Sequence, residues 1–131
     1  MSPYIWIGLG SGLGGMARYW CSLAVAARWG EAFPWGTLAV NVLGCGLIGV
    51  LAAMGDSEAR WYLPVAAREF LIIGVMGGYT TFSSFSLQTL MLMRNGEWLL
   101  AGAYVMSSVF VCLLATWLGS TVMHWLQLRG R

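Results

Sequence analysis

The residue types that suggest chemistry gather in positions 74–88, within a segment that is otherwise apolar enough to cross a bilayer. Residues 70–93 contain no charge, and a spanning helix needs about 20 apolar residues. The centre of the segment is nevertheless a weak helix, because Gly77 and Gly78 favour irregular backbone and five hydroxyl residues follow within seven positions. The composition therefore predicts a helix broken at residues 77–81.

A break at membrane depth leaves backbone carbonyls without their helical donors, and lipid cannot replace those donors. A bound cation or a water-filled cavity would satisfy the carbonyls, and both remain open. Beyond the break, Thr81, Ser84 and Gln88 recur at i, i+3 and i+7 and line one helical face, whereas Phe82 and Phe85 share an adjacent face. A polar and an aromatic stripe are thus expected side by side.

The whole composition predicts an all-α integral membrane protein with one domain, residues 1–131. The chain is 59% hydrophobic and 9% charged, whereas soluble domains carry about 25% charged residues. The length fits four spanning helices, expected at about 3–29, 35–54, 65–93 with the break at 77–81, and 98–126. All seven basic residues are arginine and the net charge is +2, so we expect no nucleic-acid partner.

The first two expected helices combine small residues with two polar side chains. The first contains two small-xxx-small pairs that favour close helix packing, Gly8/Gly12 and Gly10/Gly14. Arg18 either snorkels or pairs structurally, or it lines a positive vestibule that attracts anions. Asn41 either bridges to a neighbouring helix or donates its amide to an anion.

A stripe on the fourth expected helix recurs every four residues, at Tyr104, Ser108, Cys112 and Thr116. This stripe forms either a pore wall or a set of hydroxyls that bond their own i−4 carbonyls. Cysteine spacing indicates neither a zinc site nor a disulfide framework, so we interpret all three cysteines as small buried residues.

The ends of the expected helices carry tryptophans and arginines. The tryptophans match the aromatic belts of a membrane protein, at Trp29, Trp35, Trp61, Trp98 and Trp125. If the helices alternate in direction, four arginines lie on the N-terminal side and two on the other. This bias is weak, so the sequence is compatible with insertion in both orientations.

Residues 77–86, Gly-Gly-Tyr-Thr-Thr-Phe-Ser-Ser-Phe-Ser, closely resemble the third-helix signature of the Fluc (CrcB-type) fluoride channels, Gly-Gly-x-[ST]-Thr-Phe-Ser-[ST]-Phe-Ser. The resemblance extends to Gly-Gly-Met-Ala-Arg-Tyr-Trp at 14–20, to Gly-Thr-Leu-Ala-Val-Asn-Val-Leu-Gly at 36–44 and to the fourth-helix stripe. It implies an antiparallel, dual-topology homodimer in the bacterial inner membrane. Two pores would export fluoride passively from the cytoplasm and limit its toxicity.

The same resemblance implies roles for individual residues. A structural sodium ion, which is not transported, would be bound at the dimer centre by backbone carbonyls of Gly77 and Thr80 from both subunits. Arg18 would belong to the vestibule. The fluoride pore would be lined by eight residues: Asn41, Thr81, Phe82, Ser84, Phe85, Tyr104, Ser108 and Thr116.

These residue types suit a small, strongly hydrated anion. Hydroxyls and an amide can replace water, and the positive edges of Phe82 and Phe85 can contact an anion without binding it too tightly to release. Two positions depart from the family pattern: Gln88 stands where many relatives have Glu, and Cys112 replaces a Ser. A thiol is the weaker donor, so we expect Ser108 and Thr116 to make the contacts.

The main alternative is a small four-helix drug–proton antiporter. Such coupling needs a carboxylate inside the membrane, but every acidic residue is expected in a loop or at a helix end: Glu31, Asp56, Glu58, Glu69 and Glu97. A membrane enzyme is less favoured still, because one histidine and no acid within the membrane supply no general acid–base pair.

Overall fold

The computed structural model describes residues 2–55 and 59–129, and all regular structure in these residues is helical. The helices are α1 (Pro3–Trp29), α2 (Trp35–Ala53), α3 (Val65–Arg68), the π-helix η1 (Glu69–Met76), α4 (Gly77–Tyr79), α5 (Phe82–Arg94) and α6 (Trp98–Arg129). Asp56 and Glu58, expected in a loop, and Arg131 lie outside the described residues. The all-α class is confirmed.

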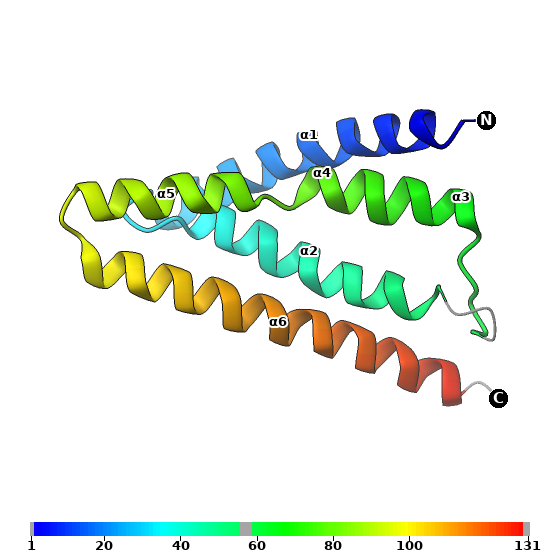
Figure 1. Cartoon of the computed structure of the whole chain (residues 1–131). Helices are drawn as coiled ribbons and strands as arrows, with labels where there is room; N and C mark the ends of the chain where they lie inside the picture. Colours follow the sequence, from blue (N-terminus) through cyan, green and yellow to red (C-terminus); the bar gives the residue numbers. More distant parts are fainter. Residues whose placement is uncertain (1, 56–58, 130–131) are drawn as a thin grey trace.

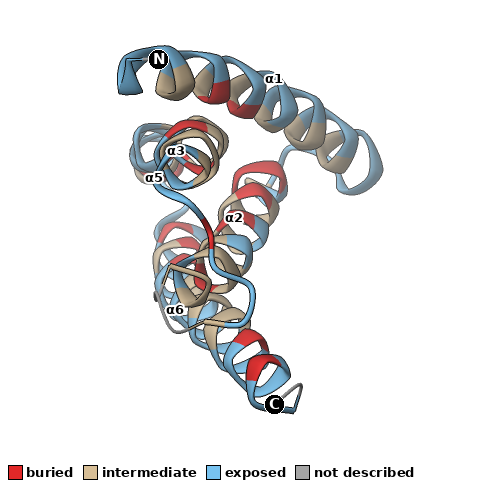
Figure 2. Cartoon of the chain, turned by 90° about the vertical axis from the view of Figure 1, so that its right-hand side faces the viewer, coloured by how far each residue is buried: buried red, intermediate tan, exposed pale blue. Residues whose placement is uncertain are grey.

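The helices run lengthwise beside one another (Figure 1). α1 and the segment from α3 to α5 run in one direction, α2 and α6 run in the other, and both chain ends lie at the same end of the molecule (Figure 1). In Figure 2, α1 slants across one edge of the group and α6 lies at the opposite edge. Buried residues lie mainly where helices face one another, and much of the outer surface is exposed (Figure 2).

Within residues 2–55 and 59–129, three segments are long and apolar enough to cross a membrane: Trp35–Ala53, Val65–Arg94 and Trp98–Arg129. α1 has 27 residues, a sufficient length for a span, but its five glycines and its two arginines, Arg18 and Arg28, lower its hydropathy. The fourth membrane span therefore stays a prediction.

Glycines bring α1 against the η1–α4 segment. A Cβ on Gly10 would lie 2.9 Å from Gly74 Cα, and one on Gly14 would lie 2.8 Å from the Tyr79 backbone nitrogen. The Gly10/Gly14 pair therefore makes the close contact that its spacing predicts. The Gly8/Gly12 pair does not, because an added Cβ at either position meets nothing within 4 Å.

The break in the third segment is shorter than predicted. Only Thr80 (φ −79°, ψ 156°) and Thr81 (φ −150°, ψ 115°) leave the helix, and Gly77–Tyr79 is helical. The predicted range of 77–81 was therefore wrong in its first three residues. Gly78 serves packing instead of irregular backbone, since a Cβ there would lie 2.9 Å from Ser11 Cα on α1.

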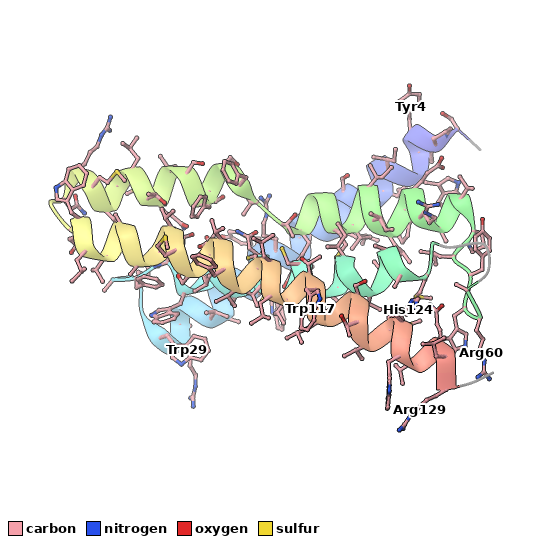
Figure 3. The ribbon with its side chains drawn as sticks, turned by 60° about the horizontal axis from the view of Figure 1, so that its bottom comes forward. Tyr4, Trp29, Arg60, Trp117, His124 and Arg129 are labelled. Atoms are coloured by element: carbon pink, nitrogen blue, oxygen red, sulfur yellow. The ribbon has the colours of Figure 1, made fainter. Side chains whose placement is uncertain are left out.

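Aromatic and basic side chains lie toward the two ends of the helices. Figure 3 shows Trp29 toward one end and Arg60 and Arg129 toward the other. Arg129 lies over the ring of Trp125, with its Cζ 3.8 Å from the ring centroid. These positions agree with the aromatic belts predicted for a membrane protein.

Candidate functional site

Asn41 on α2 binds the break directly. Its Oδ1 accepts a hydrogen bond from the backbone N–H of Thr81 at 2.8 Å, and its Nδ2 donates to the Thr81 carbonyl at 3.1 Å. One amide side chain thus satisfies both backbone groups of an extended residue. Asn41 therefore makes the interhelical bridge that was one of its two expected roles, and a second Nδ2 hydrogen remains for another acceptor.

Thr81 begins α5 as its N-cap residue. Its Oγ1 accepts from the Ser84 backbone N–H at 3.2 Å and donates to Ser84 Oγ at 3.1 Å. A threonine at this position stabilises the helix start by satisfying a backbone donor that lacks a helical partner. The hydroxyls of Thr81 and Ser84 are therefore engaged with each other.

Because of these contacts, two backbone carbonyls lose the N–H groups that would bond them in a continuous helix. In an unbroken helix the Thr81 amide would bond the Gly77 carbonyl and the Ser84 amide would bond the Thr80 carbonyl. Here the first amide bonds Asn41 and the second bonds the Thr81 hydroxyl. Gly77 and Thr80 are the residues whose carbonyls the sequence resemblance assigns to sodium, and neutral carbonyl oxygens of unwound helices suit that cation.

A cavity of about 360 Å³ lies beside the break. Its wall combines polar and aromatic residues from α2, the break, α5 and α6, among them Asn41, Thr80, Thr81, Phe82, Phe85 and Ser108. The Ser108 side chain is 8% exposed. In the described part of the chain, Ser108 Oγ is the one buried side-chain oxygen or nitrogen without a hydrogen-bond partner. Such a group normally has a partner, so this hydroxyl is a candidate ligand contact.

Aromatic rings continue from the cavity into the protein core. The centroids of Phe82 and Phe85 lie 5.3 Å apart, and Phe85 lies 5.2 Å from Tyr104. Tyr104 is fully buried and donates its hydroxyl to Gln88 Oε1 at 2.9 Å. Phe82 and Phe85 therefore line the cavity, whereas Tyr104 supports Phe85 from behind and positions Gln88.

A second cavity, of about 280 Å³, lies on the other side of Thr81 and is more polar. The predicted stripe of Thr81, Ser84 and Gln88 lines it, together with the half-buried Arg18. The structure thus brings these three residues to one cavity, as their spacing predicts. Arg18 thus lines the same cavity as these polar side chains, and its role in a vestibule stays a prediction.

The fourth-helix stripe divides into side chains with different partners. Thr116 Oγ1 donates to the Cys112 carbonyl at 3.0 Å, which is the i−4 bond expected for a structural hydroxyl. Thr116 lies outside both cavities, and Ser108 lies in the first. Only Ser108 among these hydroxyls is free to contact a ligand.

Sequence reasoning did not assign every cavity residue to the site, and two of those it left out lie on α2. Thr37 is buried and lines the second cavity, and Cys45 lines the first cavity. Both lie four residues from Asn41 on α2, at positions 37 and 45. Because four residues make about one helical turn, that spacing was the available signal.

Fold and site together define a helical membrane protein with two cavities beside a helix break, a mainly apolar one that contains a few polar groups and a more polar one. Residues 5–120 match the family described as CrcB-like protein, Camphor Resistance (CrcB). The chain belongs to the CrcB family, and the resemblance found in the sequence is confirmed. With three apolar spans and membership of this family, it is a multi-pass membrane protein.

Several similar bacterial proteins carry the name fluoride-specific ion channel FluC. The protein from Methylocella silvestris is 52% identical over 119 residues, which cover 91% of both chains. That from Opitutus terrae is 50% identical and covers 91% of this chain and 90% of its own. That from Paramagnetospirillum magneticum is 48% identical, with 91% and 93% covered.

Proposed function

We propose that this chain forms a fluoride-selective channel that exports fluoride passively from the bacterial cytoplasm across the inner membrane. The observation that carries the proposal is the buried, unpartnered hydroxyl of Ser108 in a cavity bounded by Phe82 and Phe85. The names of the similar proteins support fluoride as the ion.

A dehydrated fluoride ion in the first cavity would meet weak donors of several kinds. Ser108 Oγ would donate its hydrogen, Asn41 Nδ2 would donate the hydrogen that Thr81 leaves free, and the rings would present their positive edges. None of the described residues that line this cavity carries a charge. Conduction needs binding weak enough for release, and a set of neutral donors meets that requirement.

Arg18 would concentrate the anion before it enters the pore. Arg18 lines the second cavity together with Ser84 and Gln88, and a local positive potential raises the concentration of anions. Among the residues that the structure describes, no carboxylate lines either of these two cavities. This lining favours passive conduction over the proton-coupled transport of a drug antiporter.

The proposal includes an antiparallel, dual-topology homodimer with a structural sodium ion at its centre. Gly77 and Thr80 of each subunit would bind the ion through their carbonyls. Support comes from the diversion of the Thr81 and Ser84 amides, which removes the helical donors of those two carbonyls. A bound cation would supply the positive charge that two broken helices need at membrane depth.

Fluoride efflux from liposomes that contain the purified protein tests the function. Ser108→Ala removes the unpartnered donor and should slow efflux about tenfold or more, since a hydrogen bond to an ion contributes about 1.5–3 kcal/mol. Ser107→Ala is the matched control, because the Ser107 hydroxyl bonds the Tyr104 carbonyl at 3.2 Å and should have little effect. Equal efflux in both variants would remove Ser108 from the pathway.

The two rings are tested in the same assay. Phe82→Ile or Phe85→Ile removes a ring edge from the cavity and should impair efflux while the protein still assembles. Phe110→Ile is the control, because Phe110 does not line the cavity. Undiminished efflux in both cavity variants would show that the rings take no part.

A further inference from the structure

Two cysteines from different helices lie inside the first cavity, and the proposed conduction does not use them. Cys45 on α2 and Cys112 on α6 both line the wall that carries Asn41 and Ser108. Cys45 follows Asn41 by four residues, and Cys112 follows Ser108 by four. The two thiols thus occupy equivalent positions, one turn beyond the polar groups of the site.

The packing of α2 against α6 places these two positions at the same level. The helices run in the same direction (Figure 1). One turn beyond the cysteines, a Cβ on Gly49 would lie 3.0 Å from the Thr116 carbonyl carbon and 3.0 Å from the Ser120 nitrogen. The two backbones are therefore in contact at Gly49 and Thr116. Four residues earlier on each helix, which is about one turn, the corresponding residues are Cys45 and Cys112.

The side chains agree with this register. The Cys112 and Cys45 side chains interact with each other, and both residues are half-buried and free. The third cysteine, Cys21, lies on α1 and interacts with the Tyr79 side chain instead. The chain therefore holds one facing pair of thiols and one separate thiol that serves as an internal control.

We propose that Cys45 and Cys112 form a redox-active dithiol that closes into an intramolecular disulfide between α2 and α6. The oxidant would be a small membrane-soluble acceptor of two electrons and two protons. Both S–H bonds break, one S–S bond forms, and the acceptor leaves in its dihydro form. With a diazenedicarboxamide, the first thiol adds across the N=N bond and the second sulfur displaces the product hydrazine.

The surroundings suit this reaction. A disulfide joins residues whose Cα atoms lie about 4.4–6.8 Å apart, and the backbone contact between Gly49 and Thr116, one turn further along both helices, holds α2 close to α6. The cavity gives both side chains room to change rotamer. Closure would remove two thiol hydrogens from the wall and fix α2 to α6 beside Ser108. If the cavity conducts fluoride as proposed, oxidation should slow efflux.

The test uses purified full-length protein in detergent, treated with the diazenedicarboxamide and measured by intact mass without reductant. The wild type should lose the mass of two hydrogens and regain it after reduction. Alkylation under denaturing conditions should then label only Cys21 in the oxidised sample. Cys45→Ala and Cys112→Ala should each abolish the mass loss, and Cys21→Ala should keep it.

Two results would overturn the dithiol. One is that the folded wild type still has three alkylatable thiols after treatment with the oxidant, although the unfolded chain is readily oxidised. The other is an equal mass loss in Cys45→Ala, which would assign the bond to a different pair. Fluoride efflux from the same samples separates the two proposals. If the disulfide forms reversibly but the protein does not conduct fluoride, the proposed dithiol is supported and the proposed channel function is refuted.

Discussion

The break in the third segment should depend on a side chain of another helix. Asn41→Ala removes both hydrogen bonds to the Thr81 backbone, at 2.8 and 3.1 Å, and leaves that N–H and C=O without their partner. Hydrogen bonds between helices in membranes contribute about 0.6–2 kcal/mol each. The two bonds together predict that Asn41→Ala loses about 1–4 kcal/mol of unfolding free energy.

Unfolding of the purified protein by sodium dodecyl sulfate in mixed micelles, followed by circular dichroism, measures this loss. Asn95→Ala is the control for a lost amide in an exposed turn. If Asn41→Ala unfolds at the same detergent fraction as Asn95→Ala, the interhelical amide does not stabilise the break.

Three further predictions follow from packing, from the buried tyrosine and from the proposed ion. Gly14→Ala should lower the unfolding free energy by about 1–3 kcal/mol, because the added Cβ would lie 2.8 Å from the Tyr79 nitrogen. Gly102→Ala is the control and should not destabilise the protein, because a Cβ there would have nothing within 4 Å. Equal unfolding curves for the two variants would refute the close contact. Tyr104→Phe should lower the unfolding free energy by about 1 kcal/mol, because it removes the hydrogen bond to Gln88. The same unfolding experiment measures this loss, and a variant as stable as the wild type would show that the bond does not stabilise the protein. Purification with a bulky organic cation in place of sodium should lower the dimer fraction seen by size-exclusion chromatography, and an unchanged fraction would count against the central ion.

The positions of the helices could be predicted from the sequence because charges and turn residues separate the apolar runs. The expected limits of the second helix, 35–54, differ from the observed Trp35–Ala53 by one residue. The turn between α5 and α6 contains Gly96 at φ 80°, a conformation that glycine adopts readily. Such signals are local, so they can be read along the chain.

The exact extent of the break could not be predicted, because a distant residue determines it. Gly77 and Gly78 have intrinsically weak helix propensity, yet they remain helical, and Gly78 allows close contact with Ser11. The chain leaves the helix at Thr80 and Thr81, where Asn41, 40 positions from Thr81, takes the backbone bonds. Periodicity within one helix carries no information about such a partner.

The outline of the candidate site was predicted from the sequence, but the hydrogen-bond partner of each hydroxyl was not. Spacing alone treats Tyr104, Ser108 and Thr116 alike, yet one bonds Gln88, one has no partner and one bonds a carbonyl of its own helix. What distinguishes them is the group that each side chain meets in three dimensions. The stripe could be recognised from the sequence, but its single unpartnered donor required the structure.

Vesicles that contain only this protein show whether the cavity of neutral donors beside the break carries fluoride. An electrode records the release of trapped fluoride, and parallel vesicles report the release of chloride. We expect rapid fluoride release with little chloride release, because a larger anion fits this set of donors less well. Vesicles that retain fluoride, or that release both halides equally, would contradict this expectation.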